Sequence, residues 1–506
     1  RRKRFSLFKE LGIPGPTPSL IYGNIREIRE KGVVAALDEW ISKYGDIVGF
    51  YNGATPVLVV KDLDLIKRVQ IQDFSNFRDR GVASLFVRIH HLTSMSLSNS
   101  TGVRWRSMRK ALQSAFTPSK LRKLGSVTDL CCDEFMNILG SREVQGKTFE
   151  VGQAFQKLST DTTVRSLFGA QAYQKLCKDG TGIEVIKRQL EIFLESLVSG
   201  WQTIIVECFP EFSFVWRWIW VLRARFMKLP MDKIEEAMAP VVDLRRSCPK
   251  QDDHDDMLQL MLNAESEGNI SVVNTDQHSS EVKNGFPALR ILSDKEIQAN
   301  ICAALVDGFE AVGTAMTFMA YLLAKHQDVQ DKLRSEIIVA LEKTGEPYLD
   351  AVLRIQYLDQ VTTEALRCCP PVVGFITRTC ATDYDYNGLK IPSGMSVLIP
   401  VHQLHRDVNL WNEPKEFSPD RFSADNRGSL NPMQYQAFGN GPRGCLGMRF
   451  AQQELKVTFA KILLNYKLLL DERHLKEKEL KLKTSFIFAY PRDGVWIRLE
   501  KVSGQS

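Results

Sequence analysis

Ten residues in the C-terminal part of the chain carry its strongest signal: Phe438-Gly439-Asn440-Gly441-Pro442-Arg443-Gly444-Cys445-Leu446-Gly447. Three glycines and a proline precede the cysteine, so this backbone cannot be a regular helix or strand. A helical pattern begins at Met448, which places Cys445 just before a helix N-terminus, where N–H groups and the helix dipole favour a thiolate. The segment predicts a shaped loop that holds an anionic cysteine. The structural alternative is a glycine-rich turn around a buried thiol.

The segment resembles the haem-binding loop of the cytochrome P-450 superfamily, FxxGxRxCxG, and matches every fixed position. The resemblance implies that Cys445 is the axial ligand of the iron in haem b (iron protoporphyrin IX), that Phe438 lies in the haem-binding loop, and that Arg443 faces a haem propionate. The loop and its flanks are most similar to the animal microsomal branch that includes drug oxidases and thromboxane synthase. The implied fold is mainly α with a small β-sheet region, the single haem domain of the superfamily.

Two further motifs of the superfamily occur in the expected order before the cysteine. Glu364-Ala365-Leu366-Arg367 resembles its ExxR pair, and Pro419-Asp420-Arg421-Phe422 resembles the segment that adds a second arginine. Glu364 and Arg367 lie three residues apart on a predicted helix, where they can pair. An isolated ExxR is normally a surface ion pair. The resemblance instead implies a buried structural network of Glu364, Arg367 and Arg421.

A third motif lies in the N-terminal half. Trp105 and Arg109 resemble the superfamily's WxxxR, and their spacing puts both on one helix face. By resemblance, the indole N–H and the guanidinium hold a haem propionate. Arg80 is a looser candidate for the same role.

A long central helix is predicted from the capping pattern Ser293-Asp294-Lys295-Glu296 to about Lys325. In the superfamily this helix carries an acid followed by a threonine directly above the iron. The aligned stretch here is Asp307-Gly308-Phe309-Glu310-Ala311, so the acid is retained as Glu310 and Ala311 replaces the threonine. We expect Thr314, one turn later, to supply the missing hydroxyl. Asp307, if buried with a raised pKa, would shuttle protons.

Three functions are compatible with this departure. The first is a monooxygenase that inserts one atom of dioxygen into a lipophilic substrate (a xenobiotic, steroid or fatty acid), with electrons from NADPH through a reductase. The second is an isomerase that rearranges lipid peroxides or endoperoxides without external electrons, because thromboxane synthases also lack that threonine. The third is a non-catalytic haem protein that only binds ligands. We expect the monooxygenase, because monooxygenases dominate the superfamily.

Composition limits the other classes of function. The chain has 506 residues, 44% of them hydrophobic, and a formal net charge of +6, which is too weak and dispersed to predict nucleic-acid binding. Ten cysteines show no CxxC pair, as expected in a reducing compartment. His402 and His405 have the spacing of a metal pair, but no third ligand lies nearby, so packing is the better interpretation.

Several segments indicate a membrane-associated enzyme. Residues 1–23 form a basic and proline-rich link, and the cluster Arg1-Arg2-Lys3-Arg4 is typical of the cytoplasmic side of an anchor, so we expect an upstream anchor. Residues 24–506 are the expected catalytic domain, on the cytoplasmic face of the endoplasmic reticulum. The aromatic segment Trp201 to Leu222 is either a buried helix pair or a pocket roof that dips into the membrane interface.

The expected protein partners are NADPH–cytochrome reductase and a b-type cytochrome. A set of basic side chains near the haem-binding segments can form their docking face, although a scattered solvated set fits the pattern equally well. The set is Lys110, Lys120, Arg122, Lys123 and Arg449.

The remaining patterns predict secondary structure and the substrate pocket. Residues 47–60 predict a hairpin around Asn52-Gly53, and residues 486–499 predict a second hairpin around Arg492-Asp493-Gly494. Residues 104–263 are mostly helical in pattern, and residues 264–290 form an exposed connection. By resemblance, the pocket is shaped by loops around residues 81–100, 200–222, 372–377 and 484–490.

Overall fold

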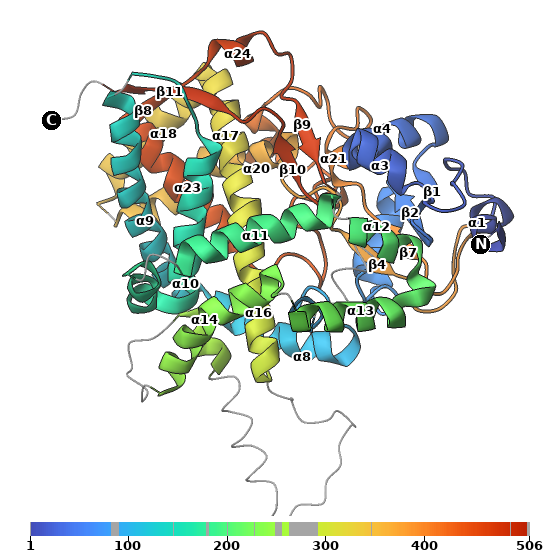
Figure 1. Ribbon diagram of the computed structural model, residues 1–506. Coiled ribbons are helices and arrows are strands. Elements are labelled where there is room, and N and C mark those ends of the chain that lie inside the picture. Colours follow the sequence, from blue (N-terminus) through green and yellow to red (C-terminus); the bar gives the residue numbers. More distant parts are fainter. Residues whose placement is uncertain are drawn as a thin grey trace, which may run out of the picture. The chain divides into compact units, whose positions relative to one another are not determined.

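The computed structural model describes most of the chain, in ten stretches: residues 2–81, 91–144, 146–178, 182–199, 201–226, 228–247, 256–262, 292–345, 347–485 and 487–502. It divides into two compact units. Unit 1 comprises Arg1–Ala83, Lys123–Thr162 and Gly308–Ser506, and unit 2 comprises Ser84–Arg122 and Thr163–Asp307. The predicted fold class, mainly α with small sheets, is confirmed (Figure 1).

Unit 1 is built on packed helices. They are α9 (Pro118–Val144, whose first residues belong to unit 2), α17 (Gly313–Lys325), α18 (Gln327–Thr344), α19 (Tyr348–Leu353), α20 (Gln356–Cys368) and α23 (Met448–Asn465). Helix α17 is buried along its whole length up to Ala324, because it is apolar on every side. It contacts α18 and α20, and these helices in turn contact α23, so they enclose one hydrophobic core.

The largest sheet also belongs to unit 1. Its strand order is β1 (Ile47–Asn52), β2 (Thr55–Val60), β7 (Ser396–Leu398) and β4 (Thr377–Thr379). β1 and β2 form the predicted hairpin, with Asn52 opposite Thr55, and β2 runs parallel to β7. The strand that carries Arg378, β4, lies at the edge of this sheet beside β7, and the Thr379 N–H donates to the Asp79 carbonyl at 2.7 Å.

The second predicted hairpin is wrong, although its strands exist. β10 (Ala489–Pro491) pairs with β9 (Leu482–Thr484), whereas β11 (Trp496–Lys501) pairs with β8 (Tyr466–Leu470) and β3 (Phe149–Glu150). The turn signal at Arg492-Asp493-Gly494 is real, since Gly494 has φ of +70°. The turn leads from one sheet into another: β10 forms a local hairpin with β9, whereas β11 pairs with strands that lie farther away in the sequence.

Unit 2 is helical in its described parts. Its main helices are α8 (Gly102–Gln113), α10 (Gly152–Lys178, which begins in unit 1), α11 (Gly182–Ser199), α12 (Trp201–Cys208), α13 (Ser213–Phe226), α14 (Pro230–Ser247) and α16 (Asp294–Asp307). α14 contacts both α11 and α16. The helical prediction for residues 104–263 is confirmed where the structure describes them. The predicted connection 264–290 and residues 82–90 of a predicted pocket loop lie outside the described residues.

Short elements complete the described chain. They are α1 (Arg2–Phe5), α2 (Leu7–Glu10), α3 (Ile25–Lys31), α4 (Val33–Tyr44), α5 (Leu63–Lys67), η1 (Arg68–Gln72), α7 (His91–Ser94), η2 (Ser114–Phe116), η3 (Pro210–Phe212), β5 (Tyr384–Tyr386), β6 (Leu389–Ile391), α21 (Val401–His405), η5 (Pro419–Phe422), α22 (Ala424–Arg427), η6 (Pro432–Gln434) and α24 (Glu472–Leu475). Within the predicted link 1–23, residues 13–18 are irregular chain, whereas Arg2–Phe5 and Leu7–Glu10 form the short helices α1 and α2.

The long central helix is confirmed from Asp294 to Lys325, with one irregularity. Between α16 and α17, residues Gly308–Val312 form a π-helical turn, η4. At the start, the Glu296 carboxylate accepts hydrogen bonds from the Ser293 N–H and hydroxyl, both 2.8 Å long, which is half of the predicted capping box. Within the described residues this is the one helix long and apolar enough to cross a membrane, and two thirds of its apolar window is buried.

Candidate functional site

The cysteine loop has the shaped backbone that its glycines predict. The Cys445 N–H donates to the Phe438 carbonyl at 2.9 Å, and the Gly444 N–H donates to the Gly441 carbonyl at 2.9 Å. Gly441 has φ of +71°, and a Cβ there would lie 2.1 Å from the carbonyl oxygen of Gln70. Only glycine can occupy this position, because any side chain would collide with backbone.

Cys445 differs from the other described cysteines in its exposure. It is exposed and lies three residues before the first residue of α23, as predicted. The others are buried in the described structure, and burial raises the pKa of Cys132 to about 12. These buried cysteines behave as small apolar side chains, whereas Cys445 meets the conditions of a ligating thiolate.

Three arginines of unit 1 gather near this loop. Arg378, in β4, is 1% exposed, and its Nε has no hydrogen-bond partner in the described structure. Burial, followed by the positive charges of Arg80 and Arg443, lowers the pKa of Arg378. Arg80 donates to the Phe375 carbonyl at 2.7 Å, and its guanidinium lies 3.9 Å from the centre of the Phe375 ring. A buried guanidinium with two further positive charges beside it is strongly stabilised when an anion binds among them.

This arrangement fits the predicted haem. An exposed cysteine on a glycine-shaped loop suits the iron, and clustered guanidinium groups suit carboxylates such as the two propionates. Arg443 also donates to the Arg78 carbonyl at 3.0 Å and lies 3.6 Å from the Asp79 carboxylate, which fixes the direction of its side chain.

Arg378 was missed by sequence reasoning. The sequence around it, an arginine between two threonines in the short strand Thr377–Thr379, is equally typical of an edge strand whose charged side chain faces water. β4 is indeed an edge strand, yet the side chain of Arg378 is buried. By contrast, Arg80 was predicted from resemblance, and the structure brings it close to Arg378.

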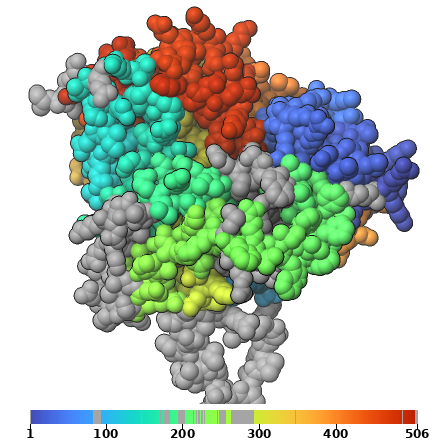
Figure 2. Space-filling model, viewed as in Figure 1, coloured from blue at the N-terminus to red at the C-terminus, as the bar shows by residue number. Residues whose placement is uncertain are grey.

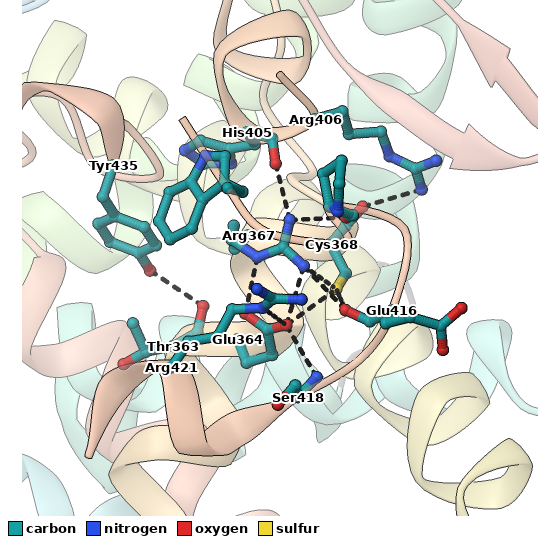
Figure 3. Close-up of polar contacts among 12 residues, drawn as sticks. Thr363, Glu364, Arg367, Cys368, His405, Arg406, Glu416, Ser418, Arg421 and Tyr435 are labelled. Carbon is teal, nitrogen blue, oxygen red and sulfur yellow. Dashed lines mark hydrogen bonds and ion pairs between the residues drawn. The ribbon is translucent and has the colours of Figure 1, made fainter. Parts of the chain in front are cut away.

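The predicted buried ion-pair network is confirmed (Figure 3). Glu364 and Arg367 on α20 are both fully buried, and two parallel hydrogen bonds of 2.7 and 2.8 Å join them. Arg421 adds a third charge, with its Nε 3.3 Å from Glu364 Oε1. Burial, the largest single cause, would lower the pKa of Arg367, but the hydrogen bonds to Glu364 and the surrounding acidic groups together raise the pKa.

The network also ties α20 to the segments that follow it. Arg367 donates to the carbonyls of His405 at 2.7 Å, Pro414 at 2.8 Å and Glu416 at 3.0 Å. The Ser418 N–H donates to Glu364 at 2.9 Å. The pair therefore anchors a non-helical stretch that leads toward the cysteine loop.

The predicted relay residues of the central helix differ in environment. Glu310 in η4 and Thr314 in α17 are buried, whereas Asp307 is exposed. The shuttle predicted for Asp307 depends on burial, so this condition is not met. Glu310 has a neighbour that sequence reasoning missed: burial, followed by the Glu310 carboxylate with which it shares a hydrogen bond, raises the pKa of Tyr490. Both residues belong to unit 1.

The π-turn around Glu310 is held from outside the helix. The buried Ser159 hydroxyl donates to the Gly308 carbonyl at 2.6 Å. A Cβ on Gly313 would lie 3.1 Å from Gln156 Cα, so glycine allows the close approach of α10. These contacts give the widened turn a fixed shape.

Trp105 and Arg109 lie one turn apart on α8, in unit 2. Trp105 is buried and Arg109 is half-buried. The predicted common face is confirmed, and their role toward a propionate stays a prediction.

The two histidines have packing roles. His405 Nε2 accepts the Gln436 N–H at 2.8 Å, and its ring stacks on Tyr435 at 5.3 Å between centroids. His402 is likewise buried. Burial lowers the pKa of both imidazoles to about 3, so they are neutral at physiological pH.

Comparisons with known proteins agree with the site. The cytochrome P450 family model matches residues 13–494. Cytochrome P450 3A9 of Rattus norvegicus is 32% identical over 489 residues, which cover 95% of this chain and 89% of that protein. Cytochrome P450 3A12 of Canis lupus familiaris is 32% identical over 94% of this chain and 88% of its own length. Cytochrome P450 3A28 of Bos taurus is 30% identical, with 95% and 88% covered.

Proposed function

Because the chain belongs to the cytochrome P450 family and is a haem-thiolate monooxygenase that uses haem b, we propose that Cys445 ligates the iron and that the substrate is a lipophilic small molecule. The observation that carries this proposal is the exposed Cys445 on its glycine-shaped loop, close in sequence to the buried Arg443. Residues 24–506 would form one catalytic domain, preceded by the link 1–23.

The reaction consumes dioxygen and two electrons. One oxygen atom enters the substrate and the other leaves as water, with two protons and two electrons that come ultimately from NADPH. Haem bound through a thiolate supplies the activation of dioxygen. We assign Arg443, Arg378 and Arg80, together with Trp105 and Arg109, to the propionates.

Protons reach this site through the central helix in our proposal. Glu310 holds the proton to be delivered, with its carboxylate oriented by the Tyr490 hydroxyl. Thr314 provides the hydroxyl that Ala311 lacks. Asp307 is left out of this relay, because its predicted role required burial and its side chain is exposed. Phe438 lies in the haem-binding loop and packs at the edge of the core of unit 1, which helps to exclude water.

Replacing Glu310 with Gln is expected to slow substrate oxygenation about 10- to 100-fold, because the amide cannot release a proton. NADPH consumption should fall less, since electrons are then lost as hydrogen peroxide. The measurement compares product formed with NADPH consumed. The control is Glu454→Gln, because burial raises the pKa of Glu454 and a neutral acid loses little on amidation. Equal coupling in both variants would remove Glu310 from the relay.

The test of the overall function uses heavy-isotope dioxygen. The haem-loaded protein is incubated with NADPH, reductase and a panel of lipophilic substrates that includes a lipid hydroperoxide. Mass spectrometry then measures how much heavy oxygen the products contain. Label in the products supports the monooxygenase. Unlabelled rearrangement of the hydroperoxide without NADPH would support the isomerase, and no turnover would support a ligand-binding protein. The relatives and the intact cysteine loop favour the first outcome.

The identity of the electron donor is also part of our proposal. A redox partner follows from the family, and we identify it as NADPH–cytochrome reductase, with a b-type cytochrome as a second donor. The predicted basic set Lys110, Lys120, Arg122, Lys123 and Arg449 is exposed or half-exposed throughout. Such charges steer an acidic partner.

Reversing two of these charges within unit 1, in Lys123→Glu/Arg449→Glu, is expected to slow haem reduction about tenfold at low salt. Substrate binding should not change. Stopped-flow reduction with reductase measures the effect, and added salt should shrink the difference. The matched control Lys390→Glu/Lys476→Glu carries the same net charge on other exposed lysines. Equal rates in both double variants would exclude this docking face.

A membrane surface is proposed as the source of substrate. Helix α13 exposes one apolar face, formed by Phe214, Trp218, Leu222 and Phe226 at four-residue spacing. Its green atoms lie at the surface in the space-filling view (Figure 2). This favours the interfacial interpretation over a buried helix pair. An endoplasmic reticulum location follows the family relationship, with the catalytic domain on the cytoplasmic face in our proposal.

Placing charges on that face, in Trp218→Glu/Leu222→Glu, is expected to weaken binding to lipid vesicles about 100-fold or more. The transfer of one such apolar side chain from water into the lipid interface is favourable by about 1.5–3 kcal/mol. The control Val408→Glu/Leu475→Glu changes two similarly exposed apolar residues elsewhere. Vesicle sedimentation measures both, and equal losses would refute the proposal.

A further inference from the structure

Behind the cysteine loop lies a buried pair of amides. Gln70 and Gln436 are 0% and 1% exposed. Gln70 Nε2 donates to Gln436 Oε1 at 3.1 Å, and Gln436 Nε2 donates to Gln70 Oε1 at 3.2 Å. Both donors and both acceptors of the facing amide edges are therefore used. Reciprocal pairing of this kind fixes two segments in one register, because any slip leaves buried polar atoms unpaired.

Gln436 is also held through every other polar group it has. Its backbone N–H donates to His405 Nε2, its Nε2 donates to the Met433 carbonyl at 2.8 Å, and its carbonyl accepts the Gly439 N–H at 3.0 Å. The last of these bonds starts the turn that leads to Cys445. Gln436 thus joins the cysteine loop to His405, whose own carbonyl accepts a bond from Arg367 (Figure 3).

Gln70 touches the loop a second time. It lies in η1, a π-helical turn of residues Arg68–Gln72, and its carbonyl approaches Gly441 so closely that no Cβ fits. The loop therefore rests on η1 at two points, Gln436 before the turn and Gly441 within it. The side chain of Gln70 sets the first contact and its backbone the second.

We propose that the Gln70–Gln436 pair is a positioning device that holds the cysteine loop in register and keeps Cys445 in its ligating place. The proposal deepens the proposed function and rests on the axial role of Cys445. The residues touch no reacting atom. They act through the loop, so their loss should show in the thiolate ligation before it shows in the fold.

The experiment uses holoprotein with Gln70→Leu, Gln436→Leu and the double variant. One readout is the rate at which the ferrous carbonyl complex loses the absorbance band of thiolate ligation in a fixed mild concentration of urea. The other is the urea midpoint of helix loss by circular dichroism. The matched control is Gln330→Leu, a fully buried glutamine on α18 that bonds to the carbonyls of Leu323 and Leu468, away from the loop.

Each single variant should lose the thiolate band about tenfold faster, which corresponds to roughly the energy of one unpaired buried amide. Gln330→Leu should lower the midpoint by at least as much and leave the band loss near the unsubstituted rate. The double variant decides between positioning and mere stability. Two leucines leave no unpaired amide, although the Met433 carbonyl still loses the donor from Gln436, so the midpoint should recover in large part. The band loss should stay fast because the register is gone.

A double variant that recovers both readouts would overturn the proposal, as would single variants whose band loss tracks the midpoint as in Gln330→Leu. Gln70→Leu lies outside the loop, so it tests the pair even if Gln436→Leu fails to load haem. If the unsubstituted holoprotein shows no thiolate band, the axial role of Cys445 fails, and this proposal fails with it. A normal band in that protein with normal kinetics in the variants refutes only the amide pair.

Discussion

Cys445→Ser protein is expected to bind haem without the carbonyl absorbance band of thiolate ligation, and to lose about a thousandfold or more of its NADPH-dependent oxygenation. A serine hydroxyl stays protonated at neutral pH and donates little electron density to the iron. A loss of about 4 kcal/mol in transition-state stabilisation gives that factor. The measurement compares product formation per haem, so that poorer haem loading does not enter the result.

The control is another cysteine of unit 1. Cys380 is buried, its Sγ lies 2.9 Å from the Thr382 carbonyl, and burial raises its pKa to about 11. A serine there can keep the hydrogen bond, so Cys380→Ser should retain the band and the activity. An intact band in Cys445→Ser, or a lost band in Cys380→Ser, would show that the wrong cysteine has been assigned.

The features that were predicted best from the sequence depend only on residues close together along the chain. The glycines around Cys445 require positive φ or close approach, and both are found. The long helix that ends at Lys325 could be predicted from its cap and its apolar run. The Glu364–Arg367 pair was predictable because three-residue spacing on a helix brings the groups together.

Features that depend on distant partners could not be predicted. Arg378 is buried although β4 lies at the edge of its sheet, and nothing in the residues around it predicts that burial. The hairpin at residues 486–499 was wrong for the same reason, since strand partners are chosen by the whole sheet. The amide pair of Gln70 and Gln436 joins residues more than three hundred positions apart. Such contacts carry no periodic pattern in the sequence.

The exposure of Asp307 illustrates a related limit of sequence patterns. Asp307 and Glu310 are three residues apart on one helix, yet only Glu310 is buried. The intervening π-turn changes which side chains share a face, and its position is set partly by Ser159 from another helix. Helical spacing alone gives both acids the same environment. The proposed proton relay therefore rests on Glu310 in the π-turn and on its neighbour Tyr490.

Breaking the buried ion pair should have the largest effect on stability. Arg367→Met leaves Glu364 buried with Arg421 at 3.3 Å, the Ser418 N–H at 2.9 Å and the weak Cys368 thiol donor at 3.7 Å to compensate its charge. It also leaves three carbonyls of the following segment without their shared donor. Removing one partner of a buried pair costs about 3–5 kcal/mol. We expect a shift of that size in the urea unfolding curve, together with poor haem retention.

Two comparisons separate this pair from ordinary ion pairs. Arg26→Met removes an exposed pair with Glu30, and the urea unfolding curve should barely move, because solvent screens that pair. Arg367→Lys keeps the positive charge but not the planar fork that makes two bonds to Glu364 and reaches the carbonyls, so it should recover only a minor part of the loss. If Arg367→Lys unfolds at the original urea concentration, charge alone stabilises the site. If Arg367→Met shifts the curve no more than Arg26→Met does, the segment before the cysteine loop is held by its packing, and the hydrogen bonds of Arg367 contribute little to it.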